Sequence, residues 1–457
     1  MRASLSQLKT ALAGARMTAD VAFDGVSTDS RNVASGNLFV ALRGEHFDAH
    51  DFLDQVAAQG AAAVVAERLP IGWTAPALVV PDTRVALGQI GNYWRRQFDI
   101  PLIGVTGSNG KTTVKEMIAA ILAAAFGDDH YLATRGNFNN EVGVPLTLLR
   151  LHAGCRAAVV ELGMNHPGEI AVLSTIAQPQ VGLVNNAQRE HQEFMESVEA
   201  VARENGAVIS HLPKNGTAVF PADDAYTELW RSYAAAASSK VITFGLSNEA
   251  DVRCTYVAND FGSDMQISAC GSTFALSLAA AGVHNVRNAL AAIACTMAIG
   301  IEADAIVRGL QAFAPVNGRL QRKKASNGAL VIDDTYNANP DSVRAAIDVL
   351  ANASAPRILV LGDMGEVGSE GQKYHEEIGA YARARGVEQL MTLGELAQHA
   401  SNAFGDGAVH HKDIAALNAA LVAQSNHNTT VLVKGSRFMK MERAVQHLLG
   451  QAHQETH

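Results

Sequence analysis

The sequence predicts an α/β protein with mostly parallel sheets divided among about three domains. Its 457 residues are more than one hydrophobic core usually covers. From about residue 84, apolar strands alternate with long helical segments, and a second series of the same kind follows. We therefore expect a small N-terminal α/β domain over residues 1–83, a central domain over 84–313 and a C-terminal domain over 314–457.

The composition excludes several classes of protein. The net charge of -9 comes without a basic stripe, so we expect no nucleic-acid partner. The best apolar run, residues 289–301, is too short to cross a bilayer, and residues 1–14 lack the apolar stretch of a signal peptide. We therefore expect a cytoplasmic protein without membrane contact. The four cysteines form no C-x-x-C pair, which argues against a zinc site or a disulfide framework.

The predicted elements follow in order along the chain. Residues 36–44 and 61–67 have the pattern of strands, and residues 50–60 between them have the pattern of a helix. The central series comprises helix 84–98, strand 101–107, helix 111–126, strand 155–163, a strand-rich patch at 240–280 and helix 284–300. The last series comprises strands 328–334, 356–364, 389–394 and 429–436, with a helix at 341–352. These last strands are apolar throughout, as parallel strands buried on both faces tend to be.

A glycine-rich turn joins strand 101–107 to helix 111–126. Glycines let the backbone turn its N–H groups toward an anion, and the start of the helix adds positive potential. Lys111 would contact the β- and γ-phosphates of a nucleotide, and Thr112 would offer a hydroxyl to Mg²⁺. A hairpin turn at Asn109-Gly110 is the alternative, but apolar residues at helical spacing follow the turn. Val105 stands where the common phosphate-loop motif has its first glycine. The predicted nucleotide-binding residues are Gly107, Ser108, Asn109, Gly110, Lys111, Thr112 and Thr113.

Two further side chains follow buried strands, where open α/β sheets collect their ligands. Glu161 ends the apolar stretch "AAVVE", and one carboxylate together with Thr112 and phosphate oxygens would suffice for Mg²⁺. His191 follows the strand "VGLVNN". Either could instead be an exposed or structural residue, since single acids and histidines usually are. Together with the glycine loop, they favour a metal-phosphate centre at one edge of the sheet.

The second domain joint carries Arg319, followed by the adjacent acids Asp333 and Asp334. A cleft between domains is where a closing enzyme needs positive charge, although Arg319 could also be a surface residue. Adjacent carboxylates point in different directions, so we expect one acid to cap the next turn and the other to contact a ligand.

These segments, in this order, resemble the Mur ligase family, the ATP-dependent amide-forming enzymes of cell-wall precursor synthesis. The resemblance covers nearly the whole chain. It rests on "TGSNGKTT" (106–113), "TRGNFNNEVGVP" (134–145), "ELGMNHPGEI" (161–170), "HNVRNALAA" (284–292), "GRL" (318–320) and "DDTYNANPDS" (333–342). Three more segments are similar to the member that joins D-alanyl-D-alanine to UDP-N-acetylmuramoyl-tripeptide: residues 27–52, 361–368 and 432–442.

The resemblance implies a central P-loop ATPase domain and a C-terminal Rossmann-like domain that acts as a lid. It implies ATP and Mg²⁺ as cofactors, an acyl-phosphate intermediate, and a monomer that acts on small molecules only. Lys111, His191 and Arg319 would be catalytic, and Thr112, Glu161 and His191 would serve the metal. Asn288 would meet the adenine, Arg319 the phosphates and Asp334 the ribose. The segment that meets the uridine diphosphate end would contain Ser27, Asp29, Ser30 and Arg31. The loop near the reacting groups would contain Asn137, Asn139 and Asn140.

The chain departs from the family at Asn205. Many members carry a carbamylated lysine at this position as an extra ligand for a second Mg²⁺. An asparagine forms no carbamate and brings no negative charge, so the second metal site is absent or completed by other groups.

Two other functions are compatible with a phosphate loop. A folylpolyglutamate synthase shares the loop and the chemistry, but the segment 27–52 argues against it, because folate ligases begin almost directly with the ATPase domain. A nucleotide-dependent switch protein would not need an N-terminal domain, and the guanine-selecting N-K-x-D motif is missing. The third residue of the acceptor peptide, meso-diaminopimelate or lysine, cannot be read from the sequence.

Overall fold

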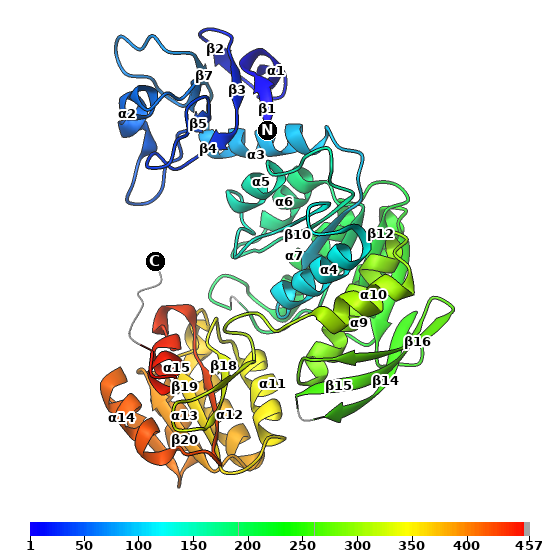
Figure 1. Ribbon diagram of the computed structural model, residues 1–457, viewed down its shortest axis with the longest axis vertical. Helices are drawn as coiled ribbons and strands as arrows, with labels where there is room; N and C mark the ends of the chain where they lie inside the picture. Colours follow the sequence, from blue (N-terminus) through cyan, green and yellow to red (C-terminus); the bar gives the residue numbers. More distant parts are fainter. Residues whose placement is uncertain (191, 260, 452–457) are drawn as a thin grey trace.

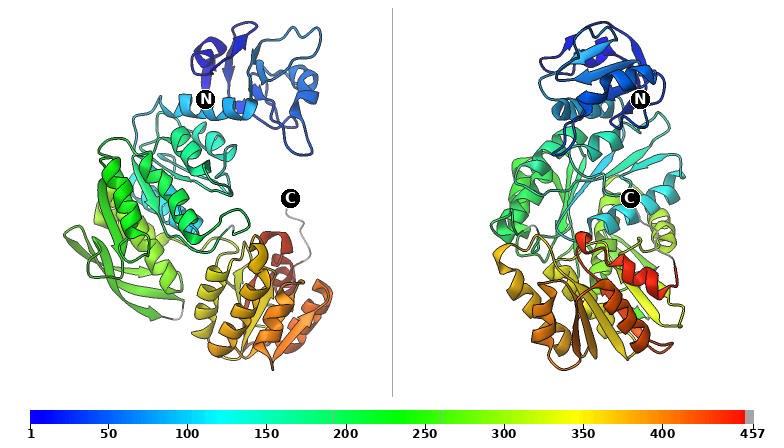
Figure 2. Two further views of the ribbon diagram at one scale, coloured as in Figure 1. Left: turned by 180° about the vertical axis from the view of Figure 1, so that it is seen from behind. Right: turned by 90° about the vertical axis from the view of Figure 1, so that its left-hand side faces the viewer.

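The structure is a computed structural model that describes residues 1–190, 192–259 and 261–451. Figure 1 shows three units along an open arc, with the N-terminal unit at one end and the C-terminal unit at the other. The views in Figure 2 show the same order from behind and from the side. The three main sheets have five, nine and six strands, and all three are mostly parallel. The predicted fold class is therefore confirmed.

The N-terminal unit is built on the strand order β2-β7-β6-β5-β4. Phe39 packs on one face of this sheet, and its neighbours Leu38 and Val40 pack on the other, so both faces are buried. A short β1–β3 pair lies beside it. The elements are β1 (Arg2–Ser4), α1 (Leu5–Lys9), β2 (Arg16–Met17), β3 (Ala22–Asp24), β4 (Val26–Ser27), β5 (Leu38–Val40), η1 (Ala49–Phe52), α2 (Leu53–Ala58), β6 (Ala63–Ala66) and β7 (Ala77–Val79).

Helix α3 (Thr83–Arg95) connects the first unit to the second. The Asp82 side chain caps it by accepting hydrogen bonds from the backbone N–H groups of Arg84 and Val85. Leu87 and Ile90 are buried in the N-terminal core, which also includes Leu149 of the central unit. One helix thus shares its apolar face between two units.

The central sheet has the strand order β16-β15-β14-β13-β12-β11-β8-β10-β9. Strands β8 to β13 are parallel, and β14 to β16 form an antiparallel extension. The strands are β8 (Leu102–Thr106), β9 (Tyr131–Ala133), β10 (Ala157–Glu161), β11 (Val181–Val184), β12 (Thr217–Pro221), β13 (Lys240–Gly245), β14 (Val252–Asn259), β15 (Gly262–Ala269) and β16 (Ser272–Leu278). The helices are α4 (Lys111–Phe126), α5 (Gly143–Leu148), α6 (Glu169–Ala177), α7 (Val198–Ser210), α8 (Thr227–Ala236), α9 (Val283–Ala298) and α10 (Ala303–Ala312).

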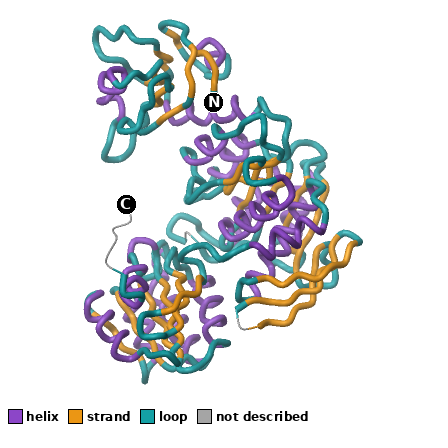
Figure 3. The backbone as a smooth tube through the Cα atoms, in the orientation of Figure 1, coloured by secondary structure: helices purple, strands orange, loops and turns teal. Residues whose placement is uncertain are grey.

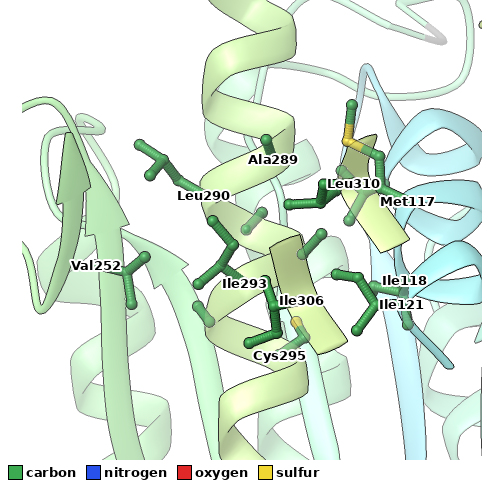
Figure 4. Packing of buried hydrophobic residues seen from close by; sticks show 14 of the residues in the cluster. Met117, Ile118, Ile121, Val252, Ala289, Leu290, Ile293, Cys295, Ile306 and Leu310 are labelled. Atoms are coloured by element: carbon green, nitrogen blue, oxygen red, sulfur yellow. The ribbon is translucent and has the colours of Figure 1, made fainter. Parts of the chain in front are cut away.

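The largest core lies on one face of this sheet. In Figure 4, Met117 and Ile121 of α4 lie beside Leu310 of α10, with Ile293 of α9 on the other side. Helix α4, which begins at the glycine loop, is therefore held by close packing along its length. This packing fixes the position of the loop relative to the sheet.

The C-terminal sheet has the strand order β17-β18-β22-β19-β20-β21, with only the edge strand β17 antiparallel among its described pairs. In Figure 3 its strands lie between helices, and alternate residues such as Val331 and Ile332 belong to cores on opposite faces. The elements are β17 (Gln321–Lys324), β18 (Leu330–Asp334), α11 (Pro340–Ala351), β19 (Arg357–Gly362), η2 (Gly368–Glu370), α12 (Gly371–Ala384), β20 (Gln389–Leu393), α13 (Ala397–Phe404), β21 (Ala408–His411), α14 (Ile414–Gln424), β22 (Thr430–Lys434), η3 (Arg437–Met439) and α15 (Glu442–Leu448).

The long predicted elements agree with the structure, and the predicted helix 111–126 has the same bounds as α4. The prediction missed short elements such as β9 and β17, whose three and four residues give too little periodicity to recognise. In the described part of the chain, no helix has both the length and the apolar character needed to span a membrane.

Candidate active site

The glycine loop lies at the carboxyl end of β8. The neighbours of β8 in the sheet are β10 and β11, neither of which adjoins it in sequence. The chain leaves β8 toward one side of the sheet and later returns to pair with its other side. Such a reversal of strand order opens a crevice at the carboxyl ends of the strands, which is where open α/β sheets bind ligands.

Two glycines shape the loop. Gly107 has φ of 131°, and an added Cβ would lie 2.9 Å from the Cβ of Asn185. Gly110 has φ of 81° and precedes the first turn of α4, and its added Cβ would lie 2.5 Å from Asn288 Oδ1. Only glycine fits both positions, because the backbone is left-handed in φ and the neighbouring side chains are in close contact. The loop thus brings the N-terminus of a sixteen-residue helix to the crevice.

Hydrogen bonds from neighbouring segments hold the loop from below. The Gly107 N–H donates to Asn205 Oδ1 at 2.9 Å, and the Asn109 N–H donates to Asn186 Oδ1 at 2.9 Å. The Ser108 hydroxyl accepts from the Gln188 N–H at 2.8 Å. Asn205 is buried, and its amide oxygen holds the loop through the Gly107 N–H. At the position where the resemblance implies a carbamylated lysine, this chain therefore has a hydrogen-bonding amide.

Lys111 and Glu190 form an ion pair in the crevice. The Lys111 Nζ lies 3.3 Å from Glu190 Oε2 and also donates to the carbonyl oxygens of Gly107 and Ser108. The amine is therefore already folded back over the loop. A phosphate bound there would compete with these oxygens for the Lys111 ammonium.

Glu161 is the last residue of β10 and is buried. Its Oε1 accepts a hydrogen bond from Asn139 Nδ2 at 2.8 Å, which links it to the asparagine-rich loop. Its Oε2 is buried with no hydrogen-bond partner among the described residues. A buried carboxylate oxygen without a partner lowers the stability of the fold unless a ligand binds to that oxygen. Of the other two predicted metal ligands, Thr112 is described with Arg319 below, and His191 lies outside the described residues.

Arg319 reaches from the C-terminal unit into the loop of the central unit. Its Nη2 donates to Thr112 Oγ1 at 3.0 Å, and its guanidinium carbon lies 4.2 Å from the centre of the Tyr336 ring. Its Nε is buried with no hydrogen-bond partner in the described chain. The structure therefore places a partly satisfied cation beside the first turn of α4.

The two adjacent acids have different surroundings, as predicted. Asp333 accepts hydrogen bonds from the Thr335 N–H and hydroxyl, and it pairs with Lys323 at 2.6 Å. Asp334 pairs with Lys434 at 2.6 Å. Burial raises the pKa of Asp334, and the charge of Lys434 opposes that shift. Only Asp334 faces the cleft described below.

Asn288 lies on α9 behind the loop. Its Oδ1 accepts from Asn185 Nδ2 at 2.9 Å, and the same Asn185 amide donates to the Asn109 carbonyl at 2.8 Å. Both asparagines are buried. This pair of amides forms a polar floor at one end of the crevice.

A cleft of about 910 Å³ between the three units brings the predicted residues together. It is lined by Ser108, Asn109, Gly110, Lys111, Thr112, Thr113, Asn137, Asn139, Asn140, Glu161, Asn288, Arg319 and Asp334. Gly107, the first residue of the loop, is not among the described lining residues. The segment with Ser27, Asp29, Ser30 and Arg31 is not part of the described lining; Ser27 ends β4 of the N-terminal sheet, and the other three residues follow it.

Two residues of the N-terminal segment, Asp29 and Arg31, pair with each other. The Asp29 carboxylate accepts from the Arg31 side chain at 2.9 Å, and this hydrogen bond lowers the pKa of Asp29 to about 2. The Arg31 side chain is 84% exposed, so its guanidinium is open to an anionic group. Ser30 is buried.

The donor set in the cleft fits a nucleotide triphosphate with Mg²⁺. The cleft offers cations for phosphates at Lys111 and Arg319, a hydroxyl at Thr112 and the unpartnered oxygen of Glu161. These are the hard oxygen donors that Mg²⁺ prefers, with phosphate oxygens and water completing its shell. Among the described residues, no three His, Cys, Asp or Glu side chains gather in a group that could hold a metal ion.

Several residues of the cleft were missed by the sequence reasoning. Glu190 and Arg189 lie in the segment after β11 that was singled out only for its histidine. Lys434 ends the buried strand β22, and a charged residue at that place could have been recognised as facing the sheet edge. Their partners, however, come from distant parts of the chain.

Comparisons with known proteins agree with this geometry. Three family models match in order: "Mur ligase family, catalytic domain" at residues 22–95, "Mur ligase middle domain" at 105–296 and "Mur ligase, glutamate ligase domain" at 318–437. A UDP-N-acetylmuramoyl-tripeptide–D-alanyl-D-alanine ligase from Escherichia coli (strain K12) is 40% identical over 449 residues, 97% of this chain and 98% of the relative.

Solved structures give the same result. A MurF crystal structure from Acinetobacter baumannii has a TM-score of 0.92 at 35% identity and covers 99% of both chains. MurF from Thermotoga maritima, solved in complex with ADP, has a TM-score of 0.84 at 26% identity and covers 93% of this chain and 97% of that one. Because sequence, fold and cleft agree over nearly the whole length, this chain belongs to the Mur ligase family and is of the MurF type.

Proposed function

We propose that this protein joins D-alanyl-D-alanine to UDP-N-acetylmuramoyl-tripeptide with the energy of ATP. The observation that carries the proposal is the contact of Arg319 with Thr112, which closes a cation-lined phosphate loop from the side of another unit. A phosphoryl group held there would lie between the sheet that binds nucleotide and the unit that would deliver the amine. Relatives that carry this activity in their names match the chain over almost its full length.

The reaction needs an activated carboxyl group, because a carboxylate is a poor electrophile. Transfer of the γ-phosphoryl group of ATP to the peptide carboxylate gives an acyl phosphate and ADP. The amine of the dipeptide then attacks the acyl carbon, and phosphate leaves as the amide forms. In-line transfer depends on positioning and charge neutralisation, which Lys111 and Arg319 would provide.

Each remaining predicted residue has a role that fits its place. Mg²⁺, when bound by Thr112 and Glu161, would neutralise phosphate charge. Asn288 would meet the adenine and Asp334 the ribose. Asn137, Asn139 and Asn140 would lie near the reacting groups. His191 stays a proposed metal ligand.

We propose domain boundaries near residues 83 and 313, with α3 packed against both neighbouring units. The N-terminal unit would hold the uridine diphosphate end of the substrate, with Ser27, Asp29, Ser30 and Arg31 in contact with it. The C-terminal unit would act as the lid that keeps water from the acyl phosphate. We also infer a cytoplasmic monomer.

A substrate matrix tests the proposal. UDP-muramyl tripeptides with meso-diaminopimelate or lysine are combined with several dipeptides, and ADP formation and product mass are both recorded. We expect ADP only when both substrates are present, with one amide formed for each ADP.

Two outcomes would contradict the proposal. Phosphate release without either substrate would favour a nucleotide-dependent switch protein. Addition of glutamate to a folate, with no reaction of the sugar peptide, would favour a folylpolyglutamate synthase.

A further inference from the structure

The segment between β11 and α7 forms one wall of the phosphate loop. Asn186 and Gln188 hydrogen-bond to Ser108 and Asn109, and Glu190 pairs with Lys111. Arg189 lies between these residues but points the other way, toward the C-terminal unit. The charge of Arg189 is thus directed across the joint between the central and C-terminal units.

Arg189 binds two carboxylates of the C-terminal unit. Its guanidinium lies 2.6 Å from Asp341 Oδ1 and 2.8 Å from Glu377 Oε2. Its backbone N–H also donates to Asp341 Oδ2 at 2.9 Å. Asp341 belongs to the first turn of α11, and Glu377 lies on α12. One residue thus contacts two helices of another unit.

A second contact lies beside the first. Asn339, which caps α11, donates to Asn109 Oδ1 at 2.9 Å. Asn339 and Asp341 are two residues apart on one helix end, and they reach the phosphate loop and its wall. Any shift of α11 that breaks the Arg189 contact would therefore also move Asn339, the hydrogen-bond partner of Asn109 in the phosphate loop.

The surroundings make this pair different from an ordinary surface ion pair. The side chains of Arg189 and Asp341 are each 23% exposed, and both residues line the cleft. Without the Arg189 side chain, the carboxylate of Asp341 would keep the Arg189 backbone N–H as a hydrogen-bond donor but would lose the charge of the guanidinium. Glu377 has a second partner in Arg344 at 3.0 Å, so Asp341 depends on Arg189 more strongly.

We propose that Arg189 is a positioning residue that holds the end of α11 against the phosphate loop and so sets the closed arrangement of the central and C-terminal units. The proposal rests on the ligase function proposed above. A residue of this kind changes the fraction of molecules ready to bind the last substrate. Its loss raises an apparent KM in proportion to the closed fraction that is lost, while the chemical step in closed molecules is unaffected.

The test uses the full chain with Arg189→Gln, Asp341→Asn and the double variant. The matched control is Arg203→Gln, which removes an exposed pair with Glu199 within α7. We expect Arg189→Gln to raise the KM for D-alanyl-D-alanine by about tenfold, with kcat within about threefold of the unchanged protein.

Two further measurements separate positioning from folding. Asp341→Asn should cost much less in the Arg189→Gln background than alone, because the two residues act as one contact. Small-angle scattering should give a larger radius of gyration for Arg189→Gln than for Arg203→Gln, with equal melting temperatures. Kinetics and scattering equal to those of Arg203→Gln, or independent effects of the two substitutions, would overturn the proposal. If the unchanged protein ligates nothing, the ligase function fails, while scattering still tests Arg189.

Discussion

The two joints of this molecule are built differently. The joint between the N-terminal and central units is mostly apolar, with Leu87 and Ile90 of α3 buried in a core shared with Leu149. The joint between the central and C-terminal units is polar where it borders the cleft, with Arg319 on Thr112 and Arg189 on Asp341.

This difference indicates which joint can move. Close-packed apolar surfaces have one good fit, and a gap or a clash costs stability at once. Ion pairs and hydrogen bonds at a wet joint exchange with water, salt or a ligand at small net cost. The cleft with its nucleotide-binding residues borders the polar joint, so substrates can act on the closure of that joint.

The largest effect is expected at the phosphate loop, where a substitution should lower the catalytic rate and leave the stability of the fold unchanged. Lys111→Ala should reduce kcat by on the order of 10³-fold, because a main charge contact to the transferred phosphoryl group is lost. The melting temperature should stay close to that of Lys373→Ala, a control that removes an exposed lysine of α12. Ligation at a near-normal rate by the Lys111 variant would remove this residue from the mechanism.

Asn205 tests whether the base of the loop tolerates change. Asn205→Lys removes the acceptor of the Gly107 N–H and places a cation at a position that is 1% exposed. We expect a loss of about 2 kcal/mol in the free energy of unfolding, with no rescue of activity by bicarbonate. Asn205→Asp keeps an acceptor and should lose less. Activity that rises with bicarbonate in the lysine variant would instead place this position at a metal.

A substitution at the apolar joint should lower the free energy of unfolding and leave the catalytic rate unchanged. An added Cβ at Gly91 of α3 would lie 2.8 Å from the Cα of Pro145 on α5, so Gly91→Ala forces α3, whose Leu87 and Ile90 belong to the joint core, away from the helix it packs on. We expect a loss of about 1–2 kcal/mol in the free energy of unfolding, measured with urea. Gln89→Ala on the same helix is the control. A Gly91 variant with unchanged stability but altered KM values would show that this joint also moves during the reaction.

The smallest effect concerns how the stability of the protein changes at acid pH. Burial and the nearby charge of Lys434 lower the pKa of His284 to about 4, below the ordinary value of 6.5. Between these two values the unfolded chain takes up a proton that the folded chain does not, so stability falls as the pH falls. A shift of this size corresponds to at most about 3 kcal/mol, and the partial exposure of His284 to the cleft reduces that value. His284→Gln should flatten this dependence between pH 6.5 and 4, whereas His427→Gln, an exposed control, should not.

The strand, loop and helix around residues 102–126 could be predicted because their signals are local. The apolar strand, the glycines and the helical spacing lie within 25 consecutive residues. Glu161 could be placed beside the loop for a similar reason, since parallel strands end at the same edge of a sheet. Arg319 could be singled out by its place at the predicted joint, but its role at the phosphates came from the resemblance, because no local pattern says which group an arginine contacts across a joint.

The contacts of Arg189 show where such reasoning stops. Its partners Asp341 and Glu377 lie 152 and 188 residues further along the chain. Which arginine meets which acid depends on how two separate cores are oriented, and the hydrophobic pattern of each core carries no information about that orientation. Asn205 is a similar case: its residue type excluded a carbamate, but only the fold brought it to the Gly107 N–H.

The sequence alone determined the α/β class, the phosphate loop and the kind of chemistry, because periodicity, glycine positions and motif order are properties of neighbouring residues. Only the tertiary structure decided that the lysine amine rests against Glu190 and that the two joints differ in character. The physical reason is that hydrogen bonds and ion pairs act over a few ångströms in space. Chain folding, and not chain order, decides which groups come within that distance.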